Sequence, residues 1–78
     1  MWYVYFIQLS NDDIYVGSSN DLQRRIASHE NGEVFSTRTY LPVTLKSYVA
    51  VSTETNAREL KRHFKSDSSK AFAIERFW

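Results

Sequence analysis

The chain of 78 residues contains no cysteine, one proline and two glycines. Without cysteine it cannot form disulfides or thiolate metal sites, and we therefore expect a reducing compartment, the cytoplasm. No apolar run reaches the roughly 18 to 20 residues that cross a bilayer, and the first residues, MWYVYFI, lack the basic segment and cleavage site of a signal peptide. The sequence therefore predicts no membrane partner.

An excess of charge of one sign is also missing. Ten Lys/Arg against nine Asp/Glu give a net charge of +1, which is too balanced to indicate a nucleic-acid partner by itself. The basic residues are nevertheless clustered, because residues 56–65, NARELKRHFK, hold four Lys/Arg and one Glu. Any phosphate-binding surface must come from such clustering.

Apolar residues are abundant, at 42% of the chain, and 15% of the residues are aromatic. This composition predicts a folded chain, and the length predicts a single small domain, residues 1–78. Six segments have the pattern of regular structure: strands at 2–9, 14–17 and 44–51, and helices at 21–32, from Ser52 or Thr53 onward, and at 68–78. Side chains alternate along a strand, so Tyr3 and Tyr5 share one face of the first strand.

The first helix, 21–32, has Gly32 in the position typical of a residue that ends a helix. On a helical wheel Arg25 and His29 border the apolar stripe, whereas Arg24 faces water. Taken singly, a strand tyrosine or a histidine at such a border is more often structural than catalytic.

On the second helix Ala57, Leu60 and Phe64 define the buried side. Lys61 lies beside this stripe and Glu59 lies opposite it.

Two triplets and two single residues form a spaced set that gives this pattern meaning: YVY at 3–5, YVG at 15–17, Arg25 and His29. This spaced set resembles the GIY-YIG endonuclease family, in particular its small single-domain members. In the first triplet Tyr3 stands where the family has glycine. The resemblance covers nearly the whole chain.

The resemblance implies an α+β fold, with a three-stranded antiparallel sheet flanked by helices, and hydrolysis of DNA phosphodiesters with Mg²⁺ or Mn²⁺, as used in DNA repair or recombination. Tyr5 or Tyr15 would act as the base or orient the water. Since a free tyrosine has a pKa of roughly 10, we expect cations, Arg25 above all, to lower it. Arg25 would also bind the phosphate bidentately, and His29 would orient a tyrosine or protonate the leaving group.

Gly17 has two explanations, of which we favour the first. Either a close backbone approach requires glycine there, or the DNA backbone passes where a side chain would obstruct it. On the second explanation Gly17 belongs to the substrate-binding site.

One position departs from the family pattern. The family holds its metal with a glutamate four residues before a lysine; Lys65 matches that lysine, so the metal position falls on Lys61. A charged lysine cannot ligate Mg²⁺. Glu59 is the first candidate to replace the missing metal ligand, although its wheel position points it away from the buried stripe and the tyrosines of the sheet. Glu54 and Asp67 are weaker candidates.

Three functions stay open: an active nuclease with another carboxylate on its metal, a DNA-binding module in which Lys61 supplies a fixed charge, and a protein-interaction domain. Lys61 and Lys65 are candidate contacts with the DNA backbone. A targeting partner protein is also open, and Trp2 and Trp78 would suit a homodimer surface.

Overall fold

The structure, a computed structural model, describes residues 1–65. Its elements follow one another along the chain as β1 (Trp2–Gln8), β2 (Ile14–Ser19), α1 (Leu22–Glu30), the 3₁₀ turn η1 (Arg38–Tyr40), β3 (Thr44–Val51) and α2 (Glu54–Phe64). The three predicted strands and the first two predicted helices are confirmed. The helix expected at 68–78 lies outside the described residues.

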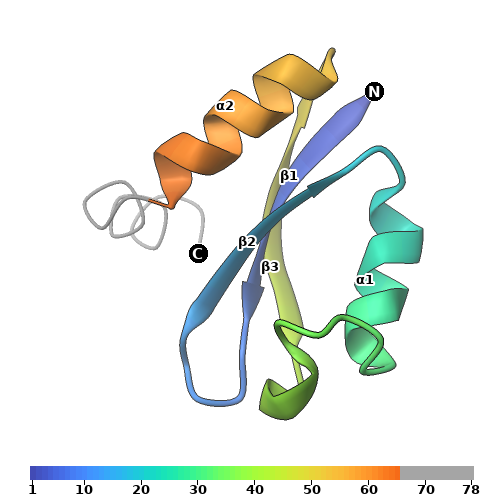
Figure 1. Cartoon of the computed structure of the whole chain (residues 1–78), viewed down its shortest axis with the longest axis vertical. Coiled ribbons are helices and arrows are strands. Elements are labelled where there is room, and N and C mark those ends of the chain that lie inside the picture. Colours follow the sequence, from blue (N-terminus) through green and yellow to red (C-terminus); the bar gives the residue numbers. More distant parts are fainter. Residues whose placement is uncertain (66–78) are drawn as a thin grey trace.

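The strands form one antiparallel sheet in the order β2-β1-β3, so that β1 is central. In this register Tyr5 lies between Gly17 on β2 and Tyr48 on β3. Figure 1 shows α1 on one side of the sheet and α2 on the other. The α+β fold with a flanked three-stranded antiparallel sheet is therefore confirmed.

The central strand buries different residues on its two faces, because its side chains alternate. Val4 and Phe6 face α2, where the ring of Phe6 packs edge to face against Phe64 at 5.0 Å between centroids. Tyr5 and Ile7 face α1. The sheet thus separates an apolar core from a second core that contains polar groups.

Helix α1 begins and ends where the sequence predicts. The Asp21 carboxylate accepts a hydrogen bond from the backbone N–H of Arg24, which caps the first turn. Gly32 has a φ of +74°, the left-handed conformation that glycine adopts at low cost after a helix. Leu22 and Ile26 pack toward the sheet, and His29 is fully buried.

Helix α2 is capped by Thr53, whose hydroxyl accepts a hydrogen bond from the backbone N–H of Asn56. Ala57 and Phe64 are buried against the sheet. Lys61 is half-buried and Glu59 is exposed, as their wheel positions predict.

The segment between α1 and β3 is a loop, as expected, apart from the short turn η1. It carries one fully buried polar residue, Thr37, toward α1. Within residues 1–65, no helix combines the length and apolar character needed to span a bilayer.

Candidate functional site

A chain of hydrogen bonds runs through the core between the sheet and α1. The Tyr5 hydroxyl lies 3.0 Å from Nε2 of His29, and Nδ1 of His29 lies 2.8 Å from Oγ1 of Thr37. Tyr5 is 1% exposed, and His29 and Thr37 are completely buried. Both ring nitrogens of His29 are therefore engaged, and the Tyr5 hydroxyl is held in one position.

The protonation of His29 follows from its surroundings. Burial lowers the pKa of His29 to about 4, and the positive charge of Arg25 acts in the same direction. At neutral pH the ring is uncharged, so one nitrogen donates a hydrogen bond and the other accepts one. Either His29 accepts from Tyr5 and donates to Thr37, or both bonds run the other way. A buried neutral imidazole of this kind suits the orientation of Tyr5 better than protonation of a leaving group.

Burial also decides the acidity of Tyr5. Removal from water raises the pKa of Tyr5, and the nearby Arg25, which acts in the opposite direction, does not overcome it. Arg25 therefore acts on the pKa of Tyr5 in the expected direction, but the net pKa is raised, because desolvation of the phenolate outweighs the cation.

Gly17 lies directly opposite Tyr5 on the neighbouring strand. A Cβ atom on Gly17 would lie within 2.3 Å of both Cζ and Oη of Tyr5. The tyrosine ring therefore occupies the space that a side chain on β2 would need, which supports the structural explanation for this glycine. Its contact with DNA stays a prediction.

Tyr15 and Arg25, two further residues predicted for the site, lie beside the Tyr5–His29–Thr37 chain, at the edge of the sheet formed by β2. Tyr15 is half-buried, with its ring centroid 5.2 Å from that of His29 and 6.4 Å from that of Tyr5. Arg25 is exposed and, with Arg24, lines a hollow of about 240 Å³. The structure thus places a buried tyrosine, a more accessible tyrosine and an arginine around one histidine.

Lys61 approaches the same edge from the other helix. Burial lowers the pKa of Lys61, and the charges of Lys65, Arg25 and Arg58 lower it further. Both helices contact β2, the edge strand, so Arg25 of α1 is near enough for its charge to act on Lys61 of α2, although the helices cover opposite faces. Lys61 and Lys65 also line a second hollow of about 240 Å³. The result is a concentration of positive charge beside the tyrosines.

The described residues do not fit a divalent metal. Residues 1–65 contain no group of three or more His, Cys, Asp or Glu side chains that could hold one. Glu59 lines a separate hollow with Arg58 and Arg62, and Glu54 pairs with Arg58 at 3.5 Å. Asp67 lies outside the described residues. The metal role of Glu59 stays a prediction, and the position nearest the site is occupied by a cation, Lys61.

Thr37 also belongs to this site; it fits the pattern of the small family members, but the sequence assigned it no role. It lies in a loop without periodicity, so neither a wheel nor a strand pattern predicts its burial. Its hydroxyl fixes the second nitrogen of His29, which makes it part of the same hydrogen-bond chain.

Comparisons with known proteins identify the family of this chain. A family model described as the GIY-YIG catalytic domain matches residues 1–76. A UPF0213 protein of Cupriavidus necator is 30% identical over 69 residues, which cover 87% of this chain and 75% of that protein. The UPF0213 protein YsiG of Lactococcus lactis is 32% identical over 65 residues, 82% of this chain and 62% of its own length.

A solved structure shows the same fold. The solution NMR structure of a UPF0213 protein from Bacillus halodurans matches with a TM-score of 0.62 and 26% identity, over 96% of this chain and 84% of that one. The names of these relatives state no activity.

Proposed function

Because this chain belongs to the GIY-YIG catalytic domain family, which points to a nuclease in general, we propose that it is a DNA endonuclease domain. The observation that carries the proposal is the buried Tyr5–His29–Thr37 hydrogen-bond chain beside the exposed Arg25. Buried polar groups lower stability unless all of them are paired, and a fully paired chain fixes the position of its hydroxyl groups. Such a chain suits a site where a hydroxyl must be held precisely.

Arg25 is suited to bind the scissile phosphate. Its guanidinium can donate two parallel hydrogen bonds to phosphate oxygens, and it is exposed to solvent where DNA can reach it. When water attacks the phosphorus, negative charge grows on the non-bridging phosphate oxygens; as the P–O bond to the leaving oxygen breaks, that oxygen takes up the proton that the attacking water releases. Arg25 and Lys61 would stabilise that charge.

The two tyrosines take different parts because they differ in exposure. Tyr15 is half-buried, so its hydroxyl can meet a water molecule at the phosphate, whereas Tyr5 is 1% exposed. The raised pKa of Tyr5 also keeps it protonated at neutral pH. We therefore assign orientation of the attacking water to Tyr15, and support of that arrangement to Tyr5 and His29.

Nucleases of this family generally use divalent metals, such as Mg²⁺ or Mn²⁺. The donor set of the described residues does not fit such an ion, because a cation, Lys61, stands at the expected position. No step of the reaction is therefore assigned to a metal.

This disagreement supports a second candidate function, a DNA-binding module that does not cut efficiently. Lys61 is half-buried among Arg25, Arg58 and Lys65, and like charges at close range destabilise a fold unless an anion offsets them. A phosphate group would be such an anion, and Lys61 would then supply the charge that a metal supplies elsewhere.

The test is an assay of labelled single-stranded, duplex and branched DNA, with Mg²⁺, with Mn²⁺ and with a chelator. We expect cleavage that falls roughly 100-fold or more in Arg25→Ala and in Tyr15→Phe. Arg24→Ala is the matched control, because it removes the same charge from the same helix and should cost much less. DNA that is bound but never cut contradicts the nuclease and supports the second candidate; no binding at low salt contradicts both.

Lys61→Glu separates the two functions. If the chain is a metal-deficient binding module, this variant should gain metal-dependent cleavage, whereas Lys61→Gln, which only removes the charge, should not. If wild type cuts and Lys61→Glu cuts less, Lys61 belongs to an active site that works in its present form.

A further inference from the structure

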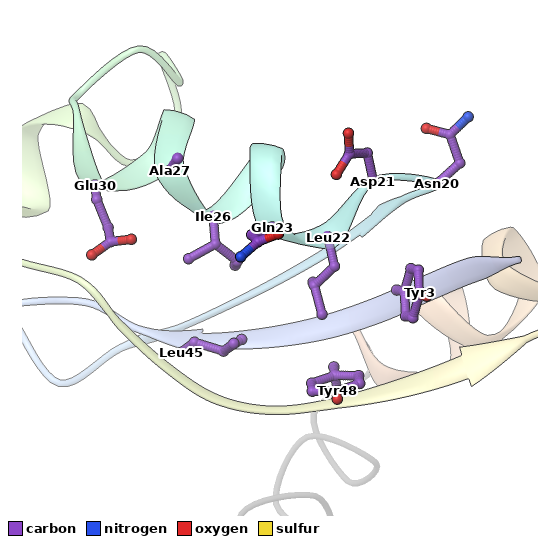
Figure 2. A pocket seen from close by; sticks show the side chains of 10 residues that line it. All are labelled: Tyr3, Asn20, Asp21, Leu22, Gln23, Ile26, Ala27, Glu30, Leu45 and Tyr48. Carbon is purple, nitrogen blue, oxygen red and sulfur yellow. The ribbon is translucent and has the colours of Figure 1, made fainter.

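A larger groove lies on the same face of the sheet as Tyr5. It has a volume of about 580 Å³, within the range of roughly 300 to 1,000 Å³ typical of sites for small organic groups. Figure 2 shows Leu22 and Ile26 pointing from α1 toward the sheet, where Tyr3 and Tyr48 stand on neighbouring strands. The groove therefore has an apolar wall and an aromatic wall.

The aromatic wall is accessible. The rings of Tyr3 and Tyr48 meet edge to face, with centroids 6.0 Å apart and an angle of 71° between their planes. Tyr48 remains 54% exposed. The pair offers a surface on which a planar group can stack.

The polar groups at the groove suit a neutral ligand that carries hydrogen-bond donors and acceptors. Asn20 and Gln23 are exposed there, and each amide can both donate and accept. The charged residues that line the groove are Asp21 and Glu30, with no Lys or Arg among the described lining residues. These carboxylates disfavour a phosphate group but not a nucleobase.

The groove is continuous with the candidate phosphate site in two ways. Tyr48 is the direct cross-strand neighbour of Tyr5, whose other neighbour is Gly17. Asn20 and Asp21 also line the hollow that contains Arg25. A DNA strand with one phosphate at Arg25 would therefore have an adjacent nucleotide beside the groove.

We propose that the groove between α1 and the Tyr3–Tyr48 pair receives an unpaired nucleobase of the DNA strand that Arg25 binds. The inference rests on the proposed function, because it requires DNA at Arg25. A base inside a continuous duplex is stacked on both faces and cannot enter, so the protein should prefer DNA with an unpaired nucleotide. One base stacked on a tyrosine corresponds to roughly 5- to 150-fold in affinity.

The experiment measures binding by fluorescence anisotropy, in chelator, of a short duplex with a one-nucleotide bulge, the same bulge with an abasic residue, and the fully paired duplex. We expect the bulged DNA to bind about 5- to 150-fold tighter than the other two. Tyr48→Ala should abolish this preference, and Tyr48→Phe should keep it. Tyr40→Ala, which removes another exposed tyrosine outside the groove, is the matched control and should also keep it.

Equal affinity for the bulged and paired DNAs would overturn the inference, as would a preference that survives Tyr48→Ala. In either case, duplex binding that Arg25→Ala abolishes would leave the proposed function standing. If wild type binds none of the three DNAs, the proposed function fails and this inference fails with it.

Discussion

The central strand β1 is buried equally on its two faces, but the faces bury different chemistry. Toward α2, Val4 and Phe6 are at most 1% exposed and meet apolar partners such as Phe64. Toward α1, Tyr5 is just as buried, and its hydroxyl is bound to His29.

The difference separates stability from function. Apolar burial stabilises the fold by roughly 25 cal/mol per Å² and does not demand an exact geometry. A buried hydrogen bond contributes only about 1 kcal/mol net, but removing one partner costs more than this, because the other partner is left buried and unpaired. The α2 face therefore holds the fold together, and the α1 face holds a hydroxyl in place. Four predictions test this division between the two faces, in order of decreasing effect on stability.

Phe6→Ala should destabilise the fold by about 3 to 5 kcal/mol, because it leaves a cavity beside Phe64. A domain of this size has only a few kcal/mol to lose, so Phe6→Leu provides a milder version. Chemical denaturation followed by circular dichroism measures both. Tyr5→Phe, which removes only an oxygen, should lose less stability but most of the DNA activity. A larger stability loss in Tyr5→Phe than in Phe6→Ala would contradict the division.

Acid should destabilise the fold through His29. In the unfolded chain the pKa is near its ordinary value of 6.5, whereas in the fold it is about 4. Between these values the unfolded state binds more protons, so stability falls as the pH decreases from about 6.5 to 4. The loss should approach about 3 kcal/mol.

Denaturation at several pH values measures this loss, with His63→Gln as a control that keeps the acid sensitivity. An NMR titration that places the pKa of His29 near 6.5 would contradict it.

Gly17→Ala should cost roughly 3 kcal/mol, because the new methyl group would enter the space of the Tyr5 ring, which His29 holds in place. It should also reduce DNA activity by displacing the Tyr5 hydroxyl. The melting temperature and a cleavage or binding assay measure the two effects. Ser18→Ala, on the adjacent position, should change neither. Unchanged stability in Gly17→Ala would show that the ring moves freely.

Thr37→Val should cost roughly 1 to 2 kcal/mol, because Nδ1 of His29 loses its partner while the volume stays nearly the same. Its distinctive effect is on the histidine, whose ¹⁵N shifts should report a changed tautomer population. Thr39→Val, at an exposed threonine of the same loop, should leave those shifts unchanged. Identical shifts in wild type and Thr37→Val would mean that Thr37 does not position His29.

The local periodicity of the sequence predicted on which face of its strand or helix each of several site residues lies. Alternation along β1 placed Tyr5 on one face, and the wheels placed His29 at the core border and Lys61 beside the buried stripe of α2. All three follow from the geometry of a single element. In the structure Tyr5 and Lys61 lie where they were predicted, whereas His29 lies deeper than the core border, because it is fully buried.

What the sequence could not predict depends on contacts between distant segments. The partner of His29, Thr37, comes from an aperiodic loop, and the rise in the pKa of Tyr5 requires knowing how completely α1 covers it. The Tyr3–Tyr48 pair depends on the register of β1 with β3. No local pattern contains this information.

We propose that the edge formed by Tyr15, Arg25 and Lys61 binds a DNA phosphate. An NMR titration of the wild-type chain with a short DNA, in chelator and low salt, tests it most directly. We predict that the largest shifts fall on the Arg25 and Lys61 side chains and on the Tyr15 ring. Shifts centred on the outer face of α2, around Glu59 and Arg62, or no shifts at all, would contradict the account.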